Sequence, residues 1–179
     1  FGLFFMGEGE ESLKHITAAL ERIPVAWYEA RAQGEIIFVL ASQLVGRKQQ
    51  AVRALDELLT HYDSLVEVRK TRLLITYVFI DLIDADLVDA DRANRRLREV
   101  VERGESAYIR AWADYLQGLI HLQRGEWDAA VESLGRSVAQ RFIHHKRAAV
   151  DSIAGLMLAH QAAGREDEAR STCEILHDY

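Results

Sequence analysis

Proline is almost absent from this 179-residue chain, in which Pro24 is the only one. No stretch is rich in proline, glycine or serine, so long uninterrupted helices are permitted along nearly the whole length. Hydrophobic residues make up 49% of the sequence, which is enough to supply a core and argues against disorder. No apolar run reaches the roughly 18 residues that a membrane span needs. The composition favours a water-exposed helical protein.

The chain has a single cysteine, and its acidic residues outnumber the basic ones by 28 to 22. Cys173 has no second cysteine to pair with, which favours a reducing compartment, and we expect the protein to be cytoplasmic. The net charge of −6 disfavours direct contact with nucleic acid and gives no reason to expect a membrane partner. The chain begins with Phe1 and its apolar start lacks the basic flank of a signal peptide, so we expect a segment of a larger protein.

The sequence lacks the short motifs that mark catalysis or metal binding. It contains no G-x4-G-K-[ST], G-x-G-x-x-G, G-x-S-x-G, H-E-x-x-H or C-x2-C. A calcium-binding EF-hand loop from Asp84 would need a central glycine and a final glutamate, where Asp89 and Arg95 stand. We therefore expect no catalytic residues, no metal site and no cofactor in this segment, and we do not expect an enzyme.

The main feature that the sequence does have is an internal repeat. A glycine is followed five positions later by a small residue and four positions after that by an apolar or small one, except that Val88 stands at the glycine place of the third copy. The copies are Gly7, Ser12 and Ile16; Gly46, Ala51 and Leu55; Val88, Ala93 and Leu97; Gly125, Ala130 and Leu134; and Gly164, Ala169 and Cys173. The small residues are 39, 42, 37 and 39 positions apart, so the period is near 39.

Each place in this pattern has a physical interpretation. The glycine ends a helix in the left-handed conformation, and the small residue lets the next helix approach its neighbour closely. The apolar residue lies one turn further along the same face and fills the core. Because one hairpin cannot bury its own apolar face, the copies must stack. The pattern predicts an all-α superhelix of about four and a half helical hairpins.

The predicted boundaries follow from the same pattern. We expect one domain over 1–179, with a half repeat over 1–24 and repeats over 25–63, 64–104, 105–142 and 143–179. The predicted helices are 10–22, 26–45, 48–62, 66–84, 89–103, 106–124, 127–141, 143–163 and 166–177.

The stretch 115–130 resembles a tetratricopeptide repeat. Gly118 and Ala130 match the small residues of that motif, while His121 stands in the place of its tyrosine and Leu134 in the place of its aromatic residue. The period is longer than the usual 34, and in this it is similar to the repeats of bacterial ATP-dependent transcriptional regulators of the maltose-activator type, within the LuxR-like group. The stretch 155–169 is similar to the same repeats.

This resemblance implies a right-handed superhelix and a non-catalytic sensor region that binds a protein, a peptide or a small-molecule effector and mediates self-assembly. The alternative is a general interaction scaffold or adaptor with an apolar concave groove. The resemblance also implies that the first helix of each hairpin lines that groove. The residues expected there are Ile36, Leu40, Gln43, Trp112, Tyr115, Leu119, Leu122, Asp151, Ala154, Leu158 and Gln161. An amphipathic helix, an apolar ligand or neighbouring repeats could each fill it.

Other groups of residues favour a structural role over a functional one. His121 and His160 occupy equivalent places, where a core substitute for tyrosine is favoured over a metal site or proton switch. Cys173 is predicted in the core. The histidines and cations of 144–147, with Arg141, are predicted to form a solvated corner. The arginines at 92, 95, 96, 98 and 103 are predicted to form a solvated face with Glu99 and Glu102 as partners.

Overall fold

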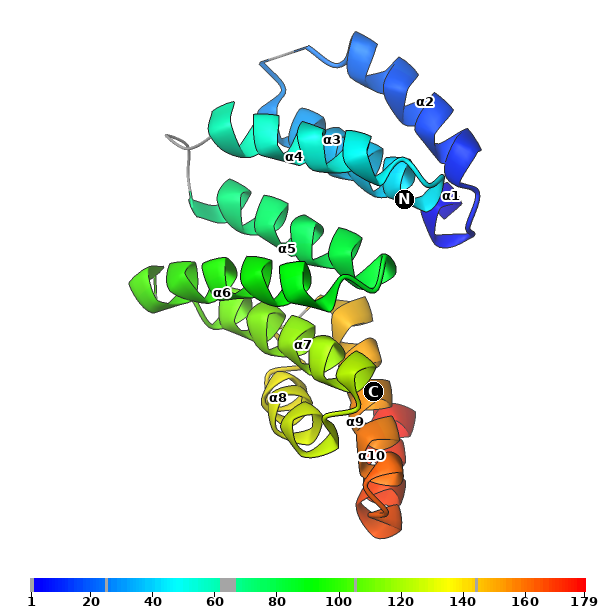
Figure 1. Ribbon diagram of the computed structural model, residues 1–179, viewed down its shortest axis with the longest axis vertical. Helices are drawn as coiled ribbons and strands as arrows, with labels where there is room; N and C mark the ends of the chain where they lie inside the picture. The colour runs from blue at the N-terminus through cyan, green and yellow to red at the C-terminus, as the bar shows by residue number, and fades with distance from the viewer. Residues whose placement is uncertain (1, 25, 62–66, 105, 144) are drawn as a thin grey trace. The chain divides into compact units, whose positions relative to one another are not determined.

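The computed structural model describes residues 2–24, 26–61, 67–104, 106–143 and 145–179. Within these ranges the chain is α-helical and contains no strand, which confirms the all-α part of the predicted fold class (Figure 1). The helices are α1 (Gly2–Phe5), α2 (Gly9–Arg22), α3 (Tyr28–Leu44), α4 (Lys48–His61), α5 (Glu67–Ile83), α6 (Leu87–Gly104), α7 (Ala107–Arg124), α8 (Trp127–Ala139), α9 (Lys146–Ala162) and α10 (Glu166–Asp178).

The chain divides into two compact units, Phe1–Ile83 and Asp84–Tyr179. Within each unit, helices that follow one another in the chain pack side by side: α2 to α5 in the first unit and α6 to α10 in the second. The expectation of one domain over 1–179, with its repeat boundaries, stays a prediction.

The predicted helices agree closely with α2 to α10, except around the turn before α9, whereas α1 was not predicted. The predicted helix ends at 62 and 66 lie outside the described residues. The predicted helices 127–141 and 143–163 leave almost no turn, whereas α8 ends at Ala139 and α9 begins at Lys146. The amides of Gln140, Arg141 and Ile143 bond to carbonyls three residues earlier, so the chain tightens here instead of continuing the α-helix.

The turns between paired helices use the left-handed backbone conformation. Gly7, Gly46, Gly125 and Gly164 all have positive φ, as the repeat predicts. At Gly125 φ is 72°, and the amides of Gly125 and Glu126 bond back to the carbonyls of Leu122 and His121. These bonds satisfy carbonyls that the end of α7 would otherwise leave without partners.

The third copy of the repeat differs from the sequence prediction. Ala85, with φ of 57°, stands two residues before α6, just as each left-handed glycine stands two residues before its helix. The residue equivalent to Ala51 is therefore Ala90, and the assignment of Ala93 was wrong. The error arose because the left-handed position holds an alanine, which carries no glycine signal in the sequence.

The corrected frame is more regular than the predicted one. The buried small residues are Ser12, Ala51, Ala90, Ala130 and Ala169, at intervals of 39, 39, 40 and 39 residues. In the same frame, the position four residues after the small residue, which Leu55 and Leu134 hold in other copies, is held by Asn94 and not by Leu97 as predicted. Asn94 is polar and fully buried.

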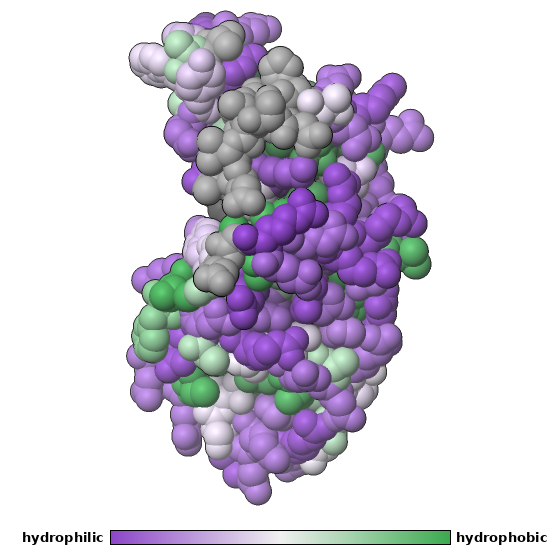
Figure 2. Space-filling model, turned by 90° about the vertical axis from the view of Figure 1, so that its left-hand side faces the viewer, coloured by the Kyte–Doolittle hydropathy of each residue, from purple (hydrophilic) through white to green (hydrophobic). Residues whose placement is uncertain are grey.

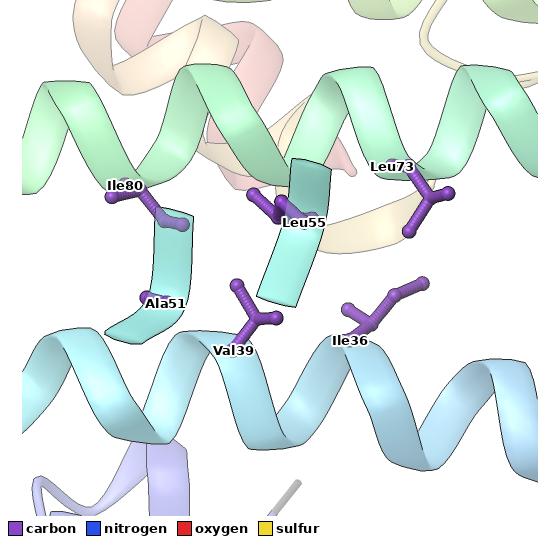
Figure 3. Close-up of a cluster of buried hydrophobic side chains, with 6 residues drawn as sticks. All are labelled: Ile36, Val39, Ala51, Leu55, Leu73 and Ile80. Carbon is purple, nitrogen blue, oxygen red and sulfur yellow. The ribbon is translucent and has the colours of Figure 1, made fainter. Parts of the chain in front are cut away.

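Three helices of the first unit share one core cluster (Figure 3). Ile36 and Val39 from α3, Ala51 and Leu55 from α4, and Leu73 and Ile80 from α5 form it. Val39, Ala51 and Leu55 are fully buried, so the small and apolar places of the repeat lie where the helices meet.

In the second unit, Leu134 of α8 lies between α7 and α9 and holds the repeat position that Leu55 holds in the first unit. A Cβ added to Gly118 of α7 would lie 2.4 Å from both Cγ and Cδ2 of Leu134, and one added to Gly155 of α9 would lie 3.1 Å from its Cδ1. Leu134 of α8 therefore packs directly on the backbones of two neighbouring helices. The hydroxyls of Ser137 and Ser152, 2.9 Å apart and buried, join α8 to α9 beside this contact.

Candidate functional site

Three aromatic side chains lie in sequence along one face of α7. The rings of Tyr108 and Trp112 are 6.5 Å apart and those of Trp112 and Tyr115 are 5.8 Å apart, both edge to face. The ring of His145, just before α9, lies 6.0 Å from Trp112. Tyr115 is 2% exposed and Tyr108 is 46% exposed, so the row runs from the core to the surface.

A hydrogen bond fixes the buried end of this row. The Tyr115 hydroxyl donates to Oδ2 of Asp151 on α9 at 3.1 Å, and Nε of Arg147 lies 3.5 Å from the same oxygen. Burial raises the pKa of Tyr115, and the negative charge of Asp151 raises it further. Tyr115 therefore stays protonated as a hydrogen-bond donor, which supports a structural anchor between α7 and α9 and gives no activated nucleophile.

The predicted groove residues of the second unit are only partly open to solvent. Trp112, Leu119 and Leu122 are half-buried, and Leu158 is 53% exposed. A Cβ on Gly155 would lie 3.0 Å from Leu122, so this leucine packs on α9. Of the remaining residues predicted here, Asp151 and Ala154 are half-buried and Gln161 is exposed.

The predicted groove residues of the first unit lie mainly in its interior. Ile36 belongs to the core cluster, Leu40 is half-buried against that cluster, and Gln43 is 6% exposed. Packing with neighbouring helices therefore accounts for these three residues. In the second unit, partly accessible aromatic and apolar side chains remain on α7 and α9. We call this surface the Trp112 face and define it by Tyr108, Trp112, Leu119, His145 and Leu158.

A buried ion-pair network lies around another side of α7, and the sequence analysis missed it. Asp114 is 5% exposed. Its Oδ1 accepts from Nη2 of Arg98 on α6 at 3.3 Å and from Nε of Arg136 on α8 at 3.0 Å. Hydrogen bonds to Asp114 and Glu132 raise the pKa of Arg136 although its burial acts in the opposite direction. One carboxylate thus links three helices.

Polar residues continue this network along α7. Asn94 donates to the carbonyl of Ala113 and to Oε1 of Gln117, at 3.1 and 3.0 Å. Nε2 of Gln117 lies 3.3 Å from Asp91 and 3.1 Å from Nε2 of His121. A sequence signal for Asp114 existed, because it shares a helix stripe with the buried Ala111 and Gly118.

The two histidines occupy different environments. His121 is half-buried, and its Nδ1 lies 2.5 Å from Oε2 of Glu126. Nδ1 of His160 is buried and has no hydrogen-bond partner among the described residues. No group of three or more side chains that could hold a metal ion occurs in the described part of the chain.

The arginines of α6 form two kinds of contact. Arg92 pairs with Asp89, Arg95 with Asp91, and Arg103 with Glu99, all at partly exposed positions. Arg98 is directed instead to the buried Asp114. The predicted pairing with Glu99 is therefore confirmed for Arg103, whereas a solvated role for Arg98 was wrong.

Two other predictions concern the C-terminal half. Cys173 is exposed, so its predicted core position was wrong. The equivalent Leu134 packs instead against the backbones of α7 and α9. At the predicted basic corner, His145, Lys146 and Arg147 are exposed, while His144 lies outside the described residues.

Hydrophilic residues dominate the face of the molecule that Figure 2 shows, and hydrophobic residues form separate patches on it. None of the helices in the described ranges has both the length and the apolarity required to cross a membrane.

Comparison of the chain with protein-family models, with curated proteins and with solved structures gives no match of any of the three kinds.

Proposed function

We propose that this chain is a non-catalytic helical-repeat region that binds a protein or peptide through the Trp112 face. The observation that carries the proposal is the aromatic row on α7, whose exposed end rests on a buried and hydrogen-bonded base. Aromatic side chains held rigidly at a surface supply large contact area at little cost in side-chain entropy, and such residues dominate the energetics of protein interfaces. The separate exposed Leu158 supplies an apolar contact on α9.

The repeat frame supports the tetratricopeptide-like interpretation of the whole chain. Left-handed residues followed five positions later by buried small residues recur at 39 or 40 positions, which is the arrangement expected of stacked hairpins. Within a larger protein, we place this chain as the sensor and self-assembly region of a bacterial regulator of the maltose-activator type. The alternative is a general adaptor. The coding sequence around this segment discriminates between them, since a regulator would carry a nucleotide-binding domain on one side and a helix-turn-helix on the other.

A selection experiment tests the binding proposal without knowledge of the natural partner. A displayed library of amphipathic helical peptides is selected on the wild-type chain, and enriched peptides are measured against Trp112→Ala, Leu158→Ala and the control Trp127→Ala. Trp127 is another partly exposed tryptophan, on α8. We expect the Trp112 change to weaken binding by about 30-fold, equivalent to about 2 kcal/mol at an interface anchor, and the control to have little effect.

The selection has clear contrary results. If no peptide is enriched, or if enriched peptides bind the folded Trp112→Ala variant as tightly as wild type, the Trp112 face is not the binding surface. Circular dichroism of each variant verifies that the helices are retained.

A further inference from the structure

A second surface hollow lies over α7, away from the Trp112 face. It has a volume of about 300 Å³ and is lined by side chains of α6, α7 and α8, including Arg95, Arg98, Gln117, His121 and Arg136. With a turn of 100° per residue, His121 projects about 180° around the helix axis from Trp112. The hollow is therefore a separate feature from the peptide-binding surface proposed above.

The hydrogen-bonding capacity of its walls is unequal. On α8, each of the three guanidinium nitrogens of Arg136 has a partner, since Nε bonds to Asp114, Nη1 to Glu132 and Nη2 to Ser133. On α6, Arg98 uses Nη2 for Asp114, and its buried Nε has no hydrogen-bond partner among the described residues.

Arg95, one turn earlier on α6, is 3.7 Å from its partner Asp91, which is too long for a good hydrogen bond. Each guanidinium group carries four N–H donors on its terminal nitrogens, and the bond of Arg98 to Asp114 uses only one of them, so Arg95 and Arg98 both keep terminal donors on the same wall.

The floor of the hollow is already ordered. Gln117 is held by Asn94 and Asp91, and His121 by Gln117 and Glu126. A ligand would therefore meet oriented polar groups without first having to order them, which lowers the cost of binding. Most of the side chains that line the hollow carry polar groups, so an apolar ligand would cover these groups without giving them hydrogen-bond partners, which is unfavourable.

We infer that this hollow binds a small oxyanion, a carboxylate or phosphate group of a small molecule, through Arg95 and Arg98. Planar guanidinium groups match the geometry of two oxygens on one such group. The volume lies at the lower end of the range of small-molecule sites, so it fits a compact ligand. Ser133, His121 and Glu132 can accept or donate hydrogen bonds to hydroxyl groups on the same ligand.

The test uses citrate and inorganic phosphate as the two probes. Each is titrated into the whole chain at constant ionic strength, with chloride as the reference salt, and binding is measured by isothermal titration calorimetry. We expect saturable binding of at least one probe. Binding of citrate alone assigns a carboxylate ligand, and binding of phosphate alone assigns a phosphoryl group.

Matched substitutions on one helix locate the site. Arg95→Gln removes an exposed guanidinium from the wall and should weaken binding at least tenfold, as should Arg98→Gln. Arg92→Gln is the control, because Arg92 is also an exposed arginine of α6 but does not line the hollow.

Absence of saturable binding by either probe overturns the inference. Equal losses in Arg92→Gln and Arg95→Gln also overturn it, because they would indicate a diffuse effect of charge. Since Arg98 also holds Asp114, a folded Arg95→Gln variant with unchanged affinity is decisive against the site even if Arg98→Gln does not fold.

Discussion

Addition of a single methyl group at Gly118 tests the close helix crossing on which the second unit depends. The new Cβ would lie 2.4 Å from both Cγ and Cδ2 of Leu134 and 3.3 Å from the Leu134 backbone nitrogen. Favourable carbon–carbon separations are about 3.5–4.0 Å, so the overlap exceeds an ångström. Leu134 cannot simply move away, because its other methyl group lies against Gly155 of α9. Helices α7 and α8 must therefore separate or Leu134 must change rotamer.

The expected loss follows from two opposing effects. Overpacking of a tight core costs about 1–3 kcal/mol. Replacement of glycine by alanine inside a helix returns up to about 1 kcal/mol. We therefore expect Gly118→Ala to destabilise the second unit by about 1–2 kcal/mol. The matched control is Gly135→Ala in α8, where the new Cβ meets nothing within 4 Å, and this change should stabilise by about 0.5–1 kcal/mol.

Urea unfolding followed by tryptophan fluorescence measures these changes. A Trp27→Phe background removes the signal of the first unit, so that Trp112 and Trp127 report the second. Equal stabilisation by Gly118→Ala and Gly135→Ala would refute the close crossing. A Leu134→Ala background provides a further check, because removal of the obstructing side chain should turn the cost of Gly118→Ala into a gain.

Four further outcomes are expected. Gly125→Ala places an alanine at φ of 72° and should lower stability by about 1 kcal/mol in the same urea assay; an unchanged midpoint would contradict this. Ala85→Gly should raise stability by about 1 kcal/mol, and a loss would argue against the corrected repeat frame. Because the pKa of Tyr115 is raised in the fold above its ordinary 10.0, the unfolded state loses this proton first. Stability should therefore fall as the pH rises past about 10, and thermal unfolding of Tyr115→Phe should show a smaller fall than wild type. Cys173 should react with a thiol reagent in the native state at nearly the rate of the unfolded chain, and strong protection would contradict its exposure.

Most helices could be predicted because their ends carry local signals. Gly46, Gly125 and Gly164 mark where a helix stops, since the left-handed conformation there favours the one residue without a Cβ. The buried alanine five positions later then fixes the register of the following helix. Such signals depend on a few neighbouring residues, so they remain readable when the rest of the repeat changes.

The third copy of the repeat shows where local signals fail. Ala85 adopts the left-handed conformation without glycine, and the buried place of the following helix holds the polar Asn94 instead of leucine. Asp86 caps the start of α6, since its Oδ1 accepts from the amide of Asp89, but Asp84 and Asp89 are equally suited to cap a helix in the sequence, so the cap did not fix the register. The nearest similar alanine, Ala93, was therefore assigned in place of Ala90, which displaced the frame by three residues.

The residues of α7 that lie near the Trp112 face could be predicted from the sequence, but their exposure could not. Helical spacing places Trp112, Tyr115, Leu119 and Leu122 on one stripe of α7. Their exposure depends on α9, because Leu122 packs near Gly155 and Tyr115 bonds to Asp151. A stripe within one helix contains no information on how closely a later helix covers it.

The polar side of α7 was still harder to predict, because its contacts join distant parts of the sequence. Asp114 bonds to arginines 16 residues before and 22 residues after it. A carboxylate on an apolar stripe predicts that some cation must accompany it, since an unpaired buried charge is strongly unfavourable. Asn94 lies at the contact of α6 with α7, since its side-chain amide donates to the Ala113 carbonyl. Arg98 follows Asn94 by one turn on the same face of α6 and therefore reaches Asp114, whereas Arg92 lies on another face and pairs with Asp89.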